Sequence, residues 1–356
     1  MKIIVICAQN LNNIRGATRA YNMYKSFKKI GVKVYYFDSW RPSIHFSFFN
    51  IFMHIKLICR LFLSDSKTYV FLENIQEPYL LRLISRFNKK LVVDIRDDRE
   101  LHAKSMGIDI NQRQKCMLDY YLAENFEFAN KIICSSSSLL NHYNLKFKKR
   151  YKDKLFTIIN ASDTNHFIKN KTNSKSFRVG FIGGLNQNSG INMLIDACIL
   201  AKKIIPNLKL DIAYNTISKT EKFEKEIIKK SSIHDFIKLD KTIFYKTAPF
   251  FFNNIDILVI PLLDTKMNQM RTSNKLFDAM ASGTPVIITD VEEQRELIQK
   301  WNIGLIADFS SVSLSEKIIK MYQDEKLYND FSFKARKLAE DDHNWDERVN
   351  KILKKI

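Results

Sequence analysis

The sequence predicts an α/β fold with two doubly wound halves in tandem. Short runs of Ile, Val and Leu alternate with longer amphipathic segments, which is typical of βαβ units that build a parallel sheet. The alternation stops near Phe167–Ser176, where the chain becomes polar and predicts a linker, and then it starts again. The 356 residues suffice for two domains, since one domain usually takes about 100–200 residues.

In the first half, the apolar run Lys2–Cys7 predicts the opening strand. The helix expected at Ala17–Ile30 ends at Gly31, because glycine is the usual residue after a helix, and Val32–Phe37 follows as a strand. Phe48–Leu63 repeats apolar residues at helical spacing. Further strands are predicted at Thr68–Leu72, Leu91–Asp94 and Lys131–Cys134, with helices between them.

The second half repeats this pattern without detectable sequence repetition. Its predicted strands are Phe177–Ile182, Lys209–Ala213, Ile237–Leu239, Ile257–Ile260 and Pro285–Thr289. Its predicted helices are Ile191–Ile204, Thr220–Lys230, Asn274–Ala281, Leu314–Met321 and Asp330–Ile356. Because ligands bind outside the carboxyl ends of parallel strands, two such halves predict a central cleft between their facing sheet edges.

Composition narrows the partners and the compartment. The excess of Lys and Arg over Asp and Glu is 57 − 38 = +19, which favours an anionic partner. The five cysteines are odd in number and never form a CxxC pair, which argues against a disulfide framework or a zinc ribbon and favours a reducing cytoplasm. No apolar stretch of about 18 residues is present, so no membrane-spanning helix is expected.

The loop Phe181–Ile191 (FIGGLNQNSGI) follows a predicted strand and opens a helix. Gly183 and Gly184 would let the backbone approach a ligand, and Gly190 stands at the helix entrance, where free amides favour a phosphate. No GxG occurs in the chain, which excludes the dinucleotide fingerprint. A plain strand–helix turn remains an equal alternative for this loop.

The segment Arg271–Asp290 carries a denser set of candidate residues. Thr272, Ser273 or Asn274 can cap the predicted helix, which would leave amides near its start for an anion. Lys275 and Asp278 stand three residues apart and therefore share a helix face. Cations suit a diphosphate and a carboxylate suits ribose hydroxyls, whereas a surface ion pair on an ordinary helix is the alternative.

Segment 273–286 has the sequence SNKLFDAMASGTPV. It resembles the P-x-K-x-x-E-x-M-A-x-G-x-P-V signature of retaining GT-B glycosyltransferases of the family 4 type, also called glycosyl transferases group 1. Several other segments resemble this family in the same order along the chain. They are Arg15–Arg19, Gly31–Val34, Val93–Asp97, Ala129–Ser135, Ile159–Asp163 and Asn254–Pro261.

This resemblance implies a GT-B fold of two Rossmann-like domains. It implies an acceptor-binding domain at 1–165, joined by a C-terminal helix at about 335–356, and a nucleotide-sugar-binding domain at 166–334. It further implies a hexosyltransferase that retains configuration, uses neither metal nor cofactor, and serves bacterial surface polysaccharide biosynthesis. The absence of D-x-D from the sequence agrees with a metal-free site.

The resemblance also assigns roles to residues. Arg271 and Lys275, with the amides of Ser273 and Asn274, would stabilise the leaving nucleoside diphosphate, and Asp278 would hold ribose hydroxyls. Gly16 and Gly184 would lie against the donor. From its own position, the segment Asp94–Arg99 follows a predicted strand that faces the cleft, so Asp97 is a candidate to orient the acceptor hydroxyl and Arg96 to meet an acceptor phosphate. A solvated charged loop is the alternative.

The sequence departs from the family at three places. The usual Arg and Lys of the second glycine loop are replaced by Gly184–Leu185 and Ser189, and one of the paired glutamates becomes Met270. Arg15 or Arg19 across the cleft would supply the missing positive charge. These departures keep an inactive GT-B protein that binds a membrane or another partner as the alternative.

The basic amphipathic segment Phe48–Leu63, with Lys56 and Arg60, favours contact with an anionic membrane, and a core helix is the alternative. The basic run Lys146–Lys154 adds a second patch. The expected partners are a nucleotide-sugar, a saccharide or lipid-linked acceptor, and an anionic membrane surface. The expected location is the cytoplasm, with peripheral attachment to the inner face of the cell membrane.

Two other functions are disfavoured. A nucleic-acid binder is disfavoured because no known module is recognisable and the aromatic residues follow core periodicity. A sugar-nucleotide epimerase is disfavoured because the sequence places no pair of acidic residues with a histidine for proton abstraction. His45 and His102 have no predicted position near the site.

Overall fold

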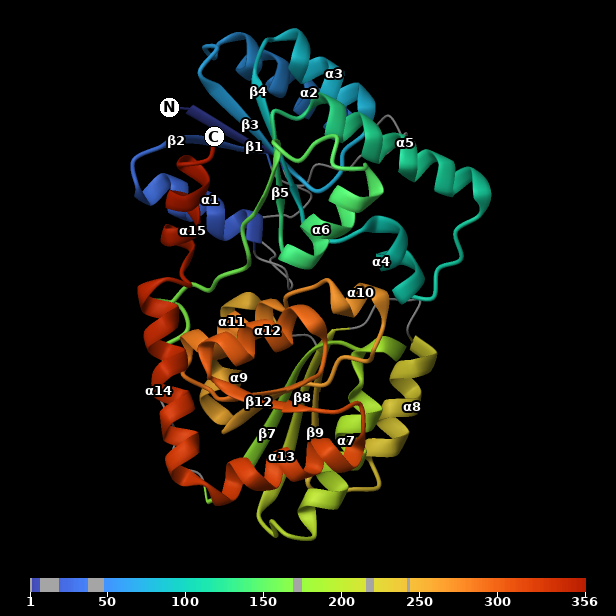
Figure 1. Cartoon of the computed structure of the whole chain (residues 1–356), viewed down its shortest axis with the longest axis vertical. Coiled ribbons are helices and arrows are strands. Elements are labelled where there is room, and N and C mark those ends of the chain that lie inside the picture. Colours follow the sequence, from blue (N-terminus) through green and yellow to red (C-terminus); the bar gives the residue numbers. More distant parts are fainter. Residues whose placement is uncertain (1, 7–18, 38–47, 169–174, 216–220, 242–243) are drawn as a thin grey trace.

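The computed structural model describes residues 2–6, 19–37, 48–168, 175–215, 221–241 and 244–356, apart from the side chains of residues 48–51 and 53. The chain forms two α/β lobes stacked along its long axis (Figure 1). Each lobe contains one parallel six-stranded sheet covered by helices on both faces. No helix among the described residues combines the length and the apolar character needed to cross a bilayer.

The N-terminal lobe has the strand order β2-β1-β3-β4-β5-β6. Successive residues of β1 face opposite cores, so Ile4 and Ile6 pack in one hydrophobic cluster and Ile3 and Val5 in the other. This two-sided burial explains why the strands read as continuous apolar runs. Its strands are β1 (Lys2–Ile6), β2 (Lys33–Phe37), β3 (Thr68–Glu73), β4 (Lys90–Ile95), β5 (Lys131–Cys134) and β6 (Leu155–Thr157). Its helices are α1 (Arg19–Lys29), α2 (Phe48–Phe62), α3 (Pro78–Arg86), α4 (Arg99–Ser105), α5 (Gln112–Phe128) and α6 (Ser137–Lys146).

The C-terminal lobe has the order β12-β11-β10-β7-β8-β9. Counted within this lobe and read from the β9 edge, the order is 3-2-1-4-5-6, the dinucleotide-fold arrangement. Its strands are β7 (Phe177–Gly184), β8 (Leu208–Asn215), β9 (Ile237–Lys241), β10 (Ile257–Ile260), β11 (Val286–Thr289) and β12 (Gly304–Ala307). Its helices are α7 (Ile191–Lys202), α8 (Glu221–Ser231), α9 (Ala248–Asn254), α10 (Lys266–Gln269), α11 (Asn274–Ala281), α12 (Glu292–Trp301), α13 (Ser311–Gln323) and α14 (Glu325–Asp341).

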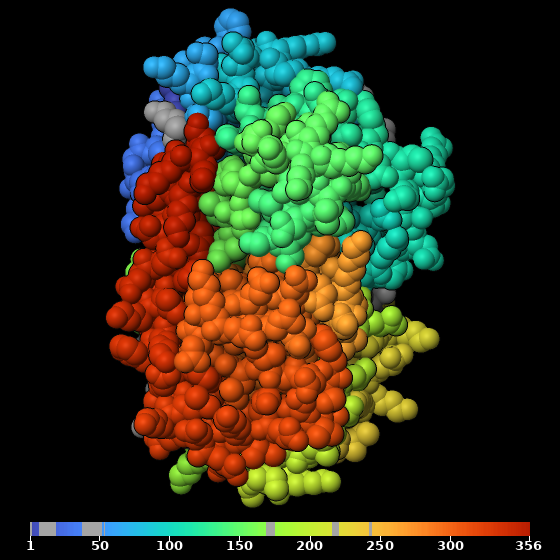
Figure 2. Space-filling model, viewed as in Figure 1, coloured from blue at the N-terminus to red at the C-terminus, as the bar shows by residue number. Residues whose placement is uncertain are grey.

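The end of the chain crosses back to the first lobe. The single helix expected at Asp330–Ile356 is wrong, because α14 ends at Asp341 and α15 (Trp345–Leu353) begins a new axis. Asn344 starts it, since its side chain accepts a hydrogen bond from the Glu347 amide at 2.9 Å. Figures 1 and 2 show α14 along the C-terminal lobe and α15 against the N-terminal lobe. Trp345 and Val349 of α15 pack in the N-terminal core.

The predicted linker is partly wrong as well. Phe167 is fully buried in a C-terminal core cluster beside Phe252 and Leu276, so the polar run does not begin there. Residues 169–174 of that run lie outside the described part of the chain. The sequence analysis missed the short strands β6 and β12 and the helix α12 because they are brief or lack a strong apolar period.

A carboxylate of the C-terminal lobe joins the two lobes at the start of α6. Glu293 is buried and accepts hydrogen bonds from the amides of Ser137 and Ser138 at 3.0 and 2.9 Å. It also accepts one from the Ser138 hydroxyl at 2.7 Å. A negative charge at a helix N-terminus is favourable, so this contact holds the lobes in register.

Candidate functional site

A cleft of about 490 Å³ opens where the carboxyl edges of the two sheets meet. In the C-terminal sheet, β7 lies beside β10, and the connections from these two strands run in opposite directions, which leaves a crevice at their carboxyl ends. Both lobes supply its walls. The lining residues are Asn74, Arg96, Asp97, Arg99, His102, Ser135, Asn160, Ile182, Gly183, Gly184, Ala213, Asn215, Phe244, Tyr245, Ala248, Arg271, Thr272, Asn274, Lys275 and Asp278.

The start of α11 forms the C-terminal wall of this cleft. Ser273 is the residue before the helix, as expected, but its side chain makes no capping hydrogen bond. Asn274 begins the helix, and its buried side-chain oxygen has no hydrogen-bond partner. Arg271 and Asn274 line the cleft. A helix start without a side-chain cap suits an anionic ligand, because amides and the helix dipole favour negative charge there.

Lys275 and Asp278 lie on one face of α11, as their spacing predicts, and both line the cleft. Burial and the neighbouring Arg271 guanidinium lower the pKa of Lys275 to about 8. Burial raises the pKa of Asp278 to about 7, against the opposing effects of Ser162 and Lys275. The Ser162 hydroxyl donates to Asp278 Oδ1 at 2.8 Å. These two side chains therefore form a poorly hydrated charge pair, a common mark of a functional site.

The glycine loop divides into a part that faces the cleft and a part that packs. Gly183 and Gly184 line the cleft, and a side-chain carbon added at Gly184 would meet only ordinary contacts, the nearest 3.8 Å away. Gly190 has φ +67°, and a carbon added there would lie 1.6 Å from the Pro261 carbonyl oxygen. Gly190 is therefore required by close packing, which corrects its expected role at a phosphate site.

The segment between β4 and α4 forms the N-terminal wall. Asp97, Arg96, Arg99 and His102 all line the cleft, so His102 is placed at the site although the sequence gave no reason to expect it there. Asp98 instead caps α4, because its Oδ1 accepts from the Leu101 amide at 3.0 Å. The negative charge of Asp97 acts on Lys275 and favours its protonated form. The charged run 94–99 is thus not a uniformly solvated loop.

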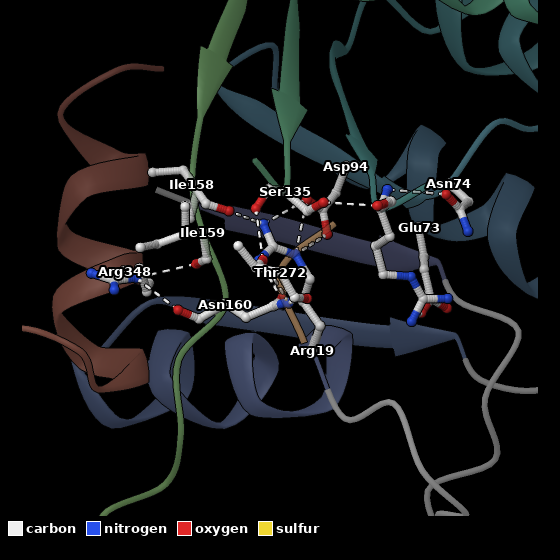
Figure 3. Close-up of polar contacts among 11 residues, drawn as sticks. Arg19, Glu73, Asn74, Asp94, Ser135, Ile158, Ile159, Asn160, Thr272 and Arg348 are labelled. Carbon is white, nitrogen blue, oxygen red and sulfur yellow. Dashed lines mark hydrogen bonds and ion pairs between the residues drawn. The ribbon is translucent and has the colours of Figure 1, made fainter. Parts of the chain in front are cut away.

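Behind the cleft, Arg19 forms a closed network (Figure 3). Its guanidinium donates to both carboxylate oxygens of Asp94, at 2.8–3.1 Å, and to the Asn160 side chain and the Ile158 carbonyl. Arg19 is 1% exposed and does not line the cleft. The expectation that Arg19 contacts a diphosphate is therefore wrong, because its guanidinium is buried and bonded to other residues of the fold. Arg15, Gly16 and His45 lie outside the described residues.

Asn160 is a lining residue to which the sequence assigned no role. Its side chain accepts from Arg19 and donates to the Thr272 carbonyl at 3.1 Å, so it connects the closed network to the start of α11. Ser135 lines the cleft nearby, and its carbonyl accepts from the Thr272 hydroxyl at 3.3 Å. The only sequence signal for Asn160 was its place in the family-like segment 159–163.

The sequence analysis missed two further lining residues, which lie beyond the predicted ends of β8 and β9. Asn215 ends β8, two residues beyond the predicted strand, and lines the cleft. Tyr245 lines it from the segment before α9, and burial raises its pKa well above the usual value. Among the described residues, no group of three or more His, Cys, Asp or Glu side chains is placed to hold a metal ion.

Comparison with known proteins identifies a family model that matches part of the chain. Residues 162–338 match the family model described as "Glycosyl transferases group 1". No curated protein matches the sequence significantly. The chain is similar over its length to several solved structures at low sequence identity, which shows the fold.

Three of these structures illustrate the similarity. Sucrose-phosphate synthase from Thermosynechococcus elongatus is 13% identical, with a TM-score of 0.74 over 99% of this chain and 97% of that one. Anabaena HepE in complex with UDP is 14% identical, with a TM-score of 0.71 over 99% of both chains. A glycosyltransferase from Rickettsia africae is 14% identical, with a TM-score of 0.75 over 99% of this chain and 97% of that one.

These findings confirm the predicted fold class, GT-B with two Rossmann-like domains. Together, the group 1 domain and the GT-B neighbours support a GT-B glycosyltransferase.

Proposed function

We propose that this chain transfers a sugar from a nucleotide-sugar to a saccharide or lipid-linked acceptor bound in the cleft. One observation carries the proposal. Lys275 and Asp278, with Arg271 beside them, lie at the carboxyl edge of a sheet with dinucleotide-fold order, and Asp97 of the other lobe faces them. This arrangement separates a cationic wall for a diphosphate from a wall for an acceptor. HepE, a structural neighbour, is in complex with UDP, which supports the nucleotide.

Lys275 and Arg271 would stabilise the departing nucleoside diphosphate. A cation in a poorly hydrated site interacts more strongly with developing charge than one in water. The lowered pKa of Lys275 reflects this poor hydration. Catalysis requires that the two groups hold the leaving diphosphate more tightly than the intact donor, and poorly hydrated cations are suited to that role.

The remaining donor contacts follow from position. Asp278 would accept hydrogen bonds from ribose hydroxyls, and the amides at Ser273 and Asn274 would meet the diphosphate. Gly184 has no side chain and would let the donor come close to the protein backbone. Asp97 would orient the attacking hydroxyl from the opposite wall.

We further propose transfer of a hexosyl group with retention and without a metal ion, in bacterial surface polysaccharide biosynthesis. The resemblance of segment 273–286 to retaining family 4 enzymes supports retention and this role. The cations of the cleft are suited to the charge that a metal ion would otherwise neutralise.

The test is a screen of UDP-, GDP-, ADP- and CMP-sugars, with the bare nucleotides, by thermal shift and by donor hydrolysis. We expect one nucleotide to raise Tm and its sugar to be hydrolysed slowly, with no loss of activity in EDTA. Loss of turnover in EDTA would contradict the metal-free mechanism. Failure of every nucleotide to bind would contradict the transferase and favour a GT-B protein that only binds a partner.

We also propose that α2 attaches the protein to an anionic membrane. Its inner face buries Leu57 and Leu61. Its outer face exposes large apolar side chains and the basic Lys56 to solvent. Isolated exposed apolar residues are ordinary, whereas a continuous face indicates an interaction surface. The exposed apolar side chains are Phe52, Ile55, Ile58, Phe62 and Leu63.

Vesicle binding tests this attachment. Ile55→Ser with Phe62→Ser should reduce co-sedimentation with vesicles of 30% phosphatidylglycerol in phosphatidylcholine by tenfold or more, because buried apolar area drives interfacial binding. Phe333→Ser is the matched control, since Phe333 is 69% exposed on α14 of the other lobe. Equal binding of the double variant and the control would remove α2 from the membrane contact.

A further inference from the structure

The N-terminal wall of the cleft holds two arginines that the donor site does not use. Arg96 and Arg99 both line the cleft, one at the end of β4 and the other at the start of α4. Both are partly buried. Buried Arg19, by comparison, donates to Asp94, Asn160 and the Ile158 carbonyl. Arg96 and Arg99 differ in this respect.

Arg96 is paired but not saturated. Its Nη1 lies 3.0 Å from Glu73 Oε1, and Glu73 is buried. Its Nε and Nη1 are nevertheless buried nitrogen atoms without an acceptor in hydrogen-bonding geometry. A buried donor without an acceptor costs about 1–3 kcal/mol, and more when it carries charge. Such a group is expected to gain when a ligand supplies the acceptor.

Arg99 has still less compensation. Its guanidinium donates to the Ile75 carbonyl, and among the described residues no carboxylate forms an ion pair with it. Burial lowers the pKa of its guanidinium. His102 stands three residues further along α4 and therefore on the same face, exposed at the cleft. This wall thus presents two incompletely paired guanidinium groups and an imidazole.

The positive charges of the cleft are unevenly compensated. Its lining contains four basic side chains, Arg96, Arg99, Arg271 and Lys275. The lining carboxylates are Asp97 and Asp278, and burial raises the pKa of Asp278 to about 7. A diphosphate on Arg271 and Lys275 would leave, on the opposite wall, Arg96 paired with Glu73 and Arg99 without an ion-pair carboxylate among the described residues.

We propose that Arg96 and Arg99 bind a phosphate group carried by the acceptor. A phosphate monoester has a charge near −2 and several acceptor oxygens, which matches two guanidinium forks. That the phosphate belongs to an acceptor rests on the proposed function, whereas the phosphate site itself does not depend on it. The phosphate could belong to a sugar phosphate or to a lipid carrier, since both present the same group.

The primary test titrates inorganic phosphate into the protein, with and without saturating UDP, by isothermal titration calorimetry. The variant is Arg99→Gln, because Arg96 supports buried Glu73 and its loss would disturb the fold. Arg113→Gln is the matched control, exposed on α5. We expect phosphate to bind the UDP-loaded protein, with at least tenfold weaker binding in Arg99→Gln and no change in Arg113→Gln.

Three outcomes would overturn the inference. They are no phosphate binding once UDP is bound, phosphate binding that Arg99→Gln leaves unchanged, and a loss of UDP affinity in Arg99→Gln as large as the loss of phosphate affinity. Arg99→Lys, which keeps the charge, guards against misfolding and should retain binding within a few-fold, with Tm as the check on both variants. If no nucleotide binds but Arg99-dependent phosphate binding persists, the transferase proposal fails and the phosphate site stands.

Competition identifies the source of the phosphate. Glucose 6-phosphate should displace inorganic phosphate if the acceptor is a sugar phosphate, while glucose should not. Vesicles containing phosphatidic acid should displace it if the acceptor is a lipid. Displacement by either supports the site, and displacement by neither would contradict an acceptor phosphate at Arg99.

Discussion

Two groups of charged residues lie near the boundary between the lobes, and they differ in how completely they are paired. Behind the cleft, Arg19 and Asp94 meet in a two-oxygen contact and share further bonds with Asn160 and Ile158. Inside the cleft, Lys275 and Asp278 share a helix face, but their pKa values are shifted toward the neutral forms by poor hydration. The first group is bonded to the fold around it, whereas the second lines an open cleft.

The difference teaches how to separate architecture from function among buried charges. A buried ion pair with satisfied bonds locks one arrangement of segments, whereas a buried charge without them raises the free energy of the free protein. Proteins retain such destabilising charges at functional sites, where a ligand or a transition state stabilises them. The comparison predicts that substitutions behind the cleft change stability and substitutions inside it change activity.

The largest effect is expected from Arg19→Leu. It leaves Asp94 buried without a cation and should lower the free energy of unfolding by about 3–5 kcal/mol, measured by urea denaturation. Arg82→Leu is the matched control, since Arg82 pairs with Glu124 at the surface, where such a pair contributes about 0–1 kcal/mol. Equal losses of stability in the two variants would show that the buried Arg19 network stabilises the fold no more than a surface ion pair does.

Lys275→Ala should show the opposite behaviour. We expect turnover to fall by tens-fold or more, because the leaving diphosphate loses a poorly hydrated cation, while Tm stays the same or rises. Lys266→Ala, exposed on α10, is the control and should leave turnover unchanged. A folded Lys275→Ala protein with wild-type turnover would remove this lysine from the reaction.

The pH dependence of nucleotide affinity should follow Lys275. A diphosphate binds the protonated amine more tightly, so affinity should be greatest below pH 8 and decrease by up to about tenfold per unit above it. Lys275→Arg should flatten this alkaline limb, since arginine stays charged. Calorimetric titration between pH 6.5 and 9.5 is the measurement, and an identical limb in Lys275→Arg would assign it to another group.

The smallest effect is expected from Asp278→Asn. The amide can still accept from Ser162, so the fold should persist, while weaker ribose contacts should raise the donor KM several-fold with little change in kcat. Asp341→Asn, exposed at the end of α14, serves as the control. Unaltered donor affinity in Asp278→Asn would exclude the ribose role and leave Asp278 as a partner of Ser162 alone.

Local pattern was sufficient where the structure depends on neighbours in the chain. Apolar runs predicted β5 at Lys131–Cys134, and the helix signals predicted α11 at Asn274–Ala281, each at its observed bounds. Helical spacing also placed Lys275 and Asp278 on one face. Local pattern failed where a short polar stretch acts through distant contacts, as at the break before α15, whose Trp345 packs in the other lobe.

The sequence by itself determined the two-halved α/β fold and the helix that carries the candidate donor residues, because periodicity and capping act within a few residues of each other. Only the tertiary structure decided that Arg19 is buried in a network behind the cleft and that Arg99 lines the cleft. In sequence Arg19 lies in a predicted helix and Arg99 follows a predicted strand, and neither place indicates its partners, but Arg19 contacts Asp94 and Asn160 at separations of 75 and 141 residues. Pairing and hydration of a charge are set by whichever segments fold around it, and no local pattern contains that information.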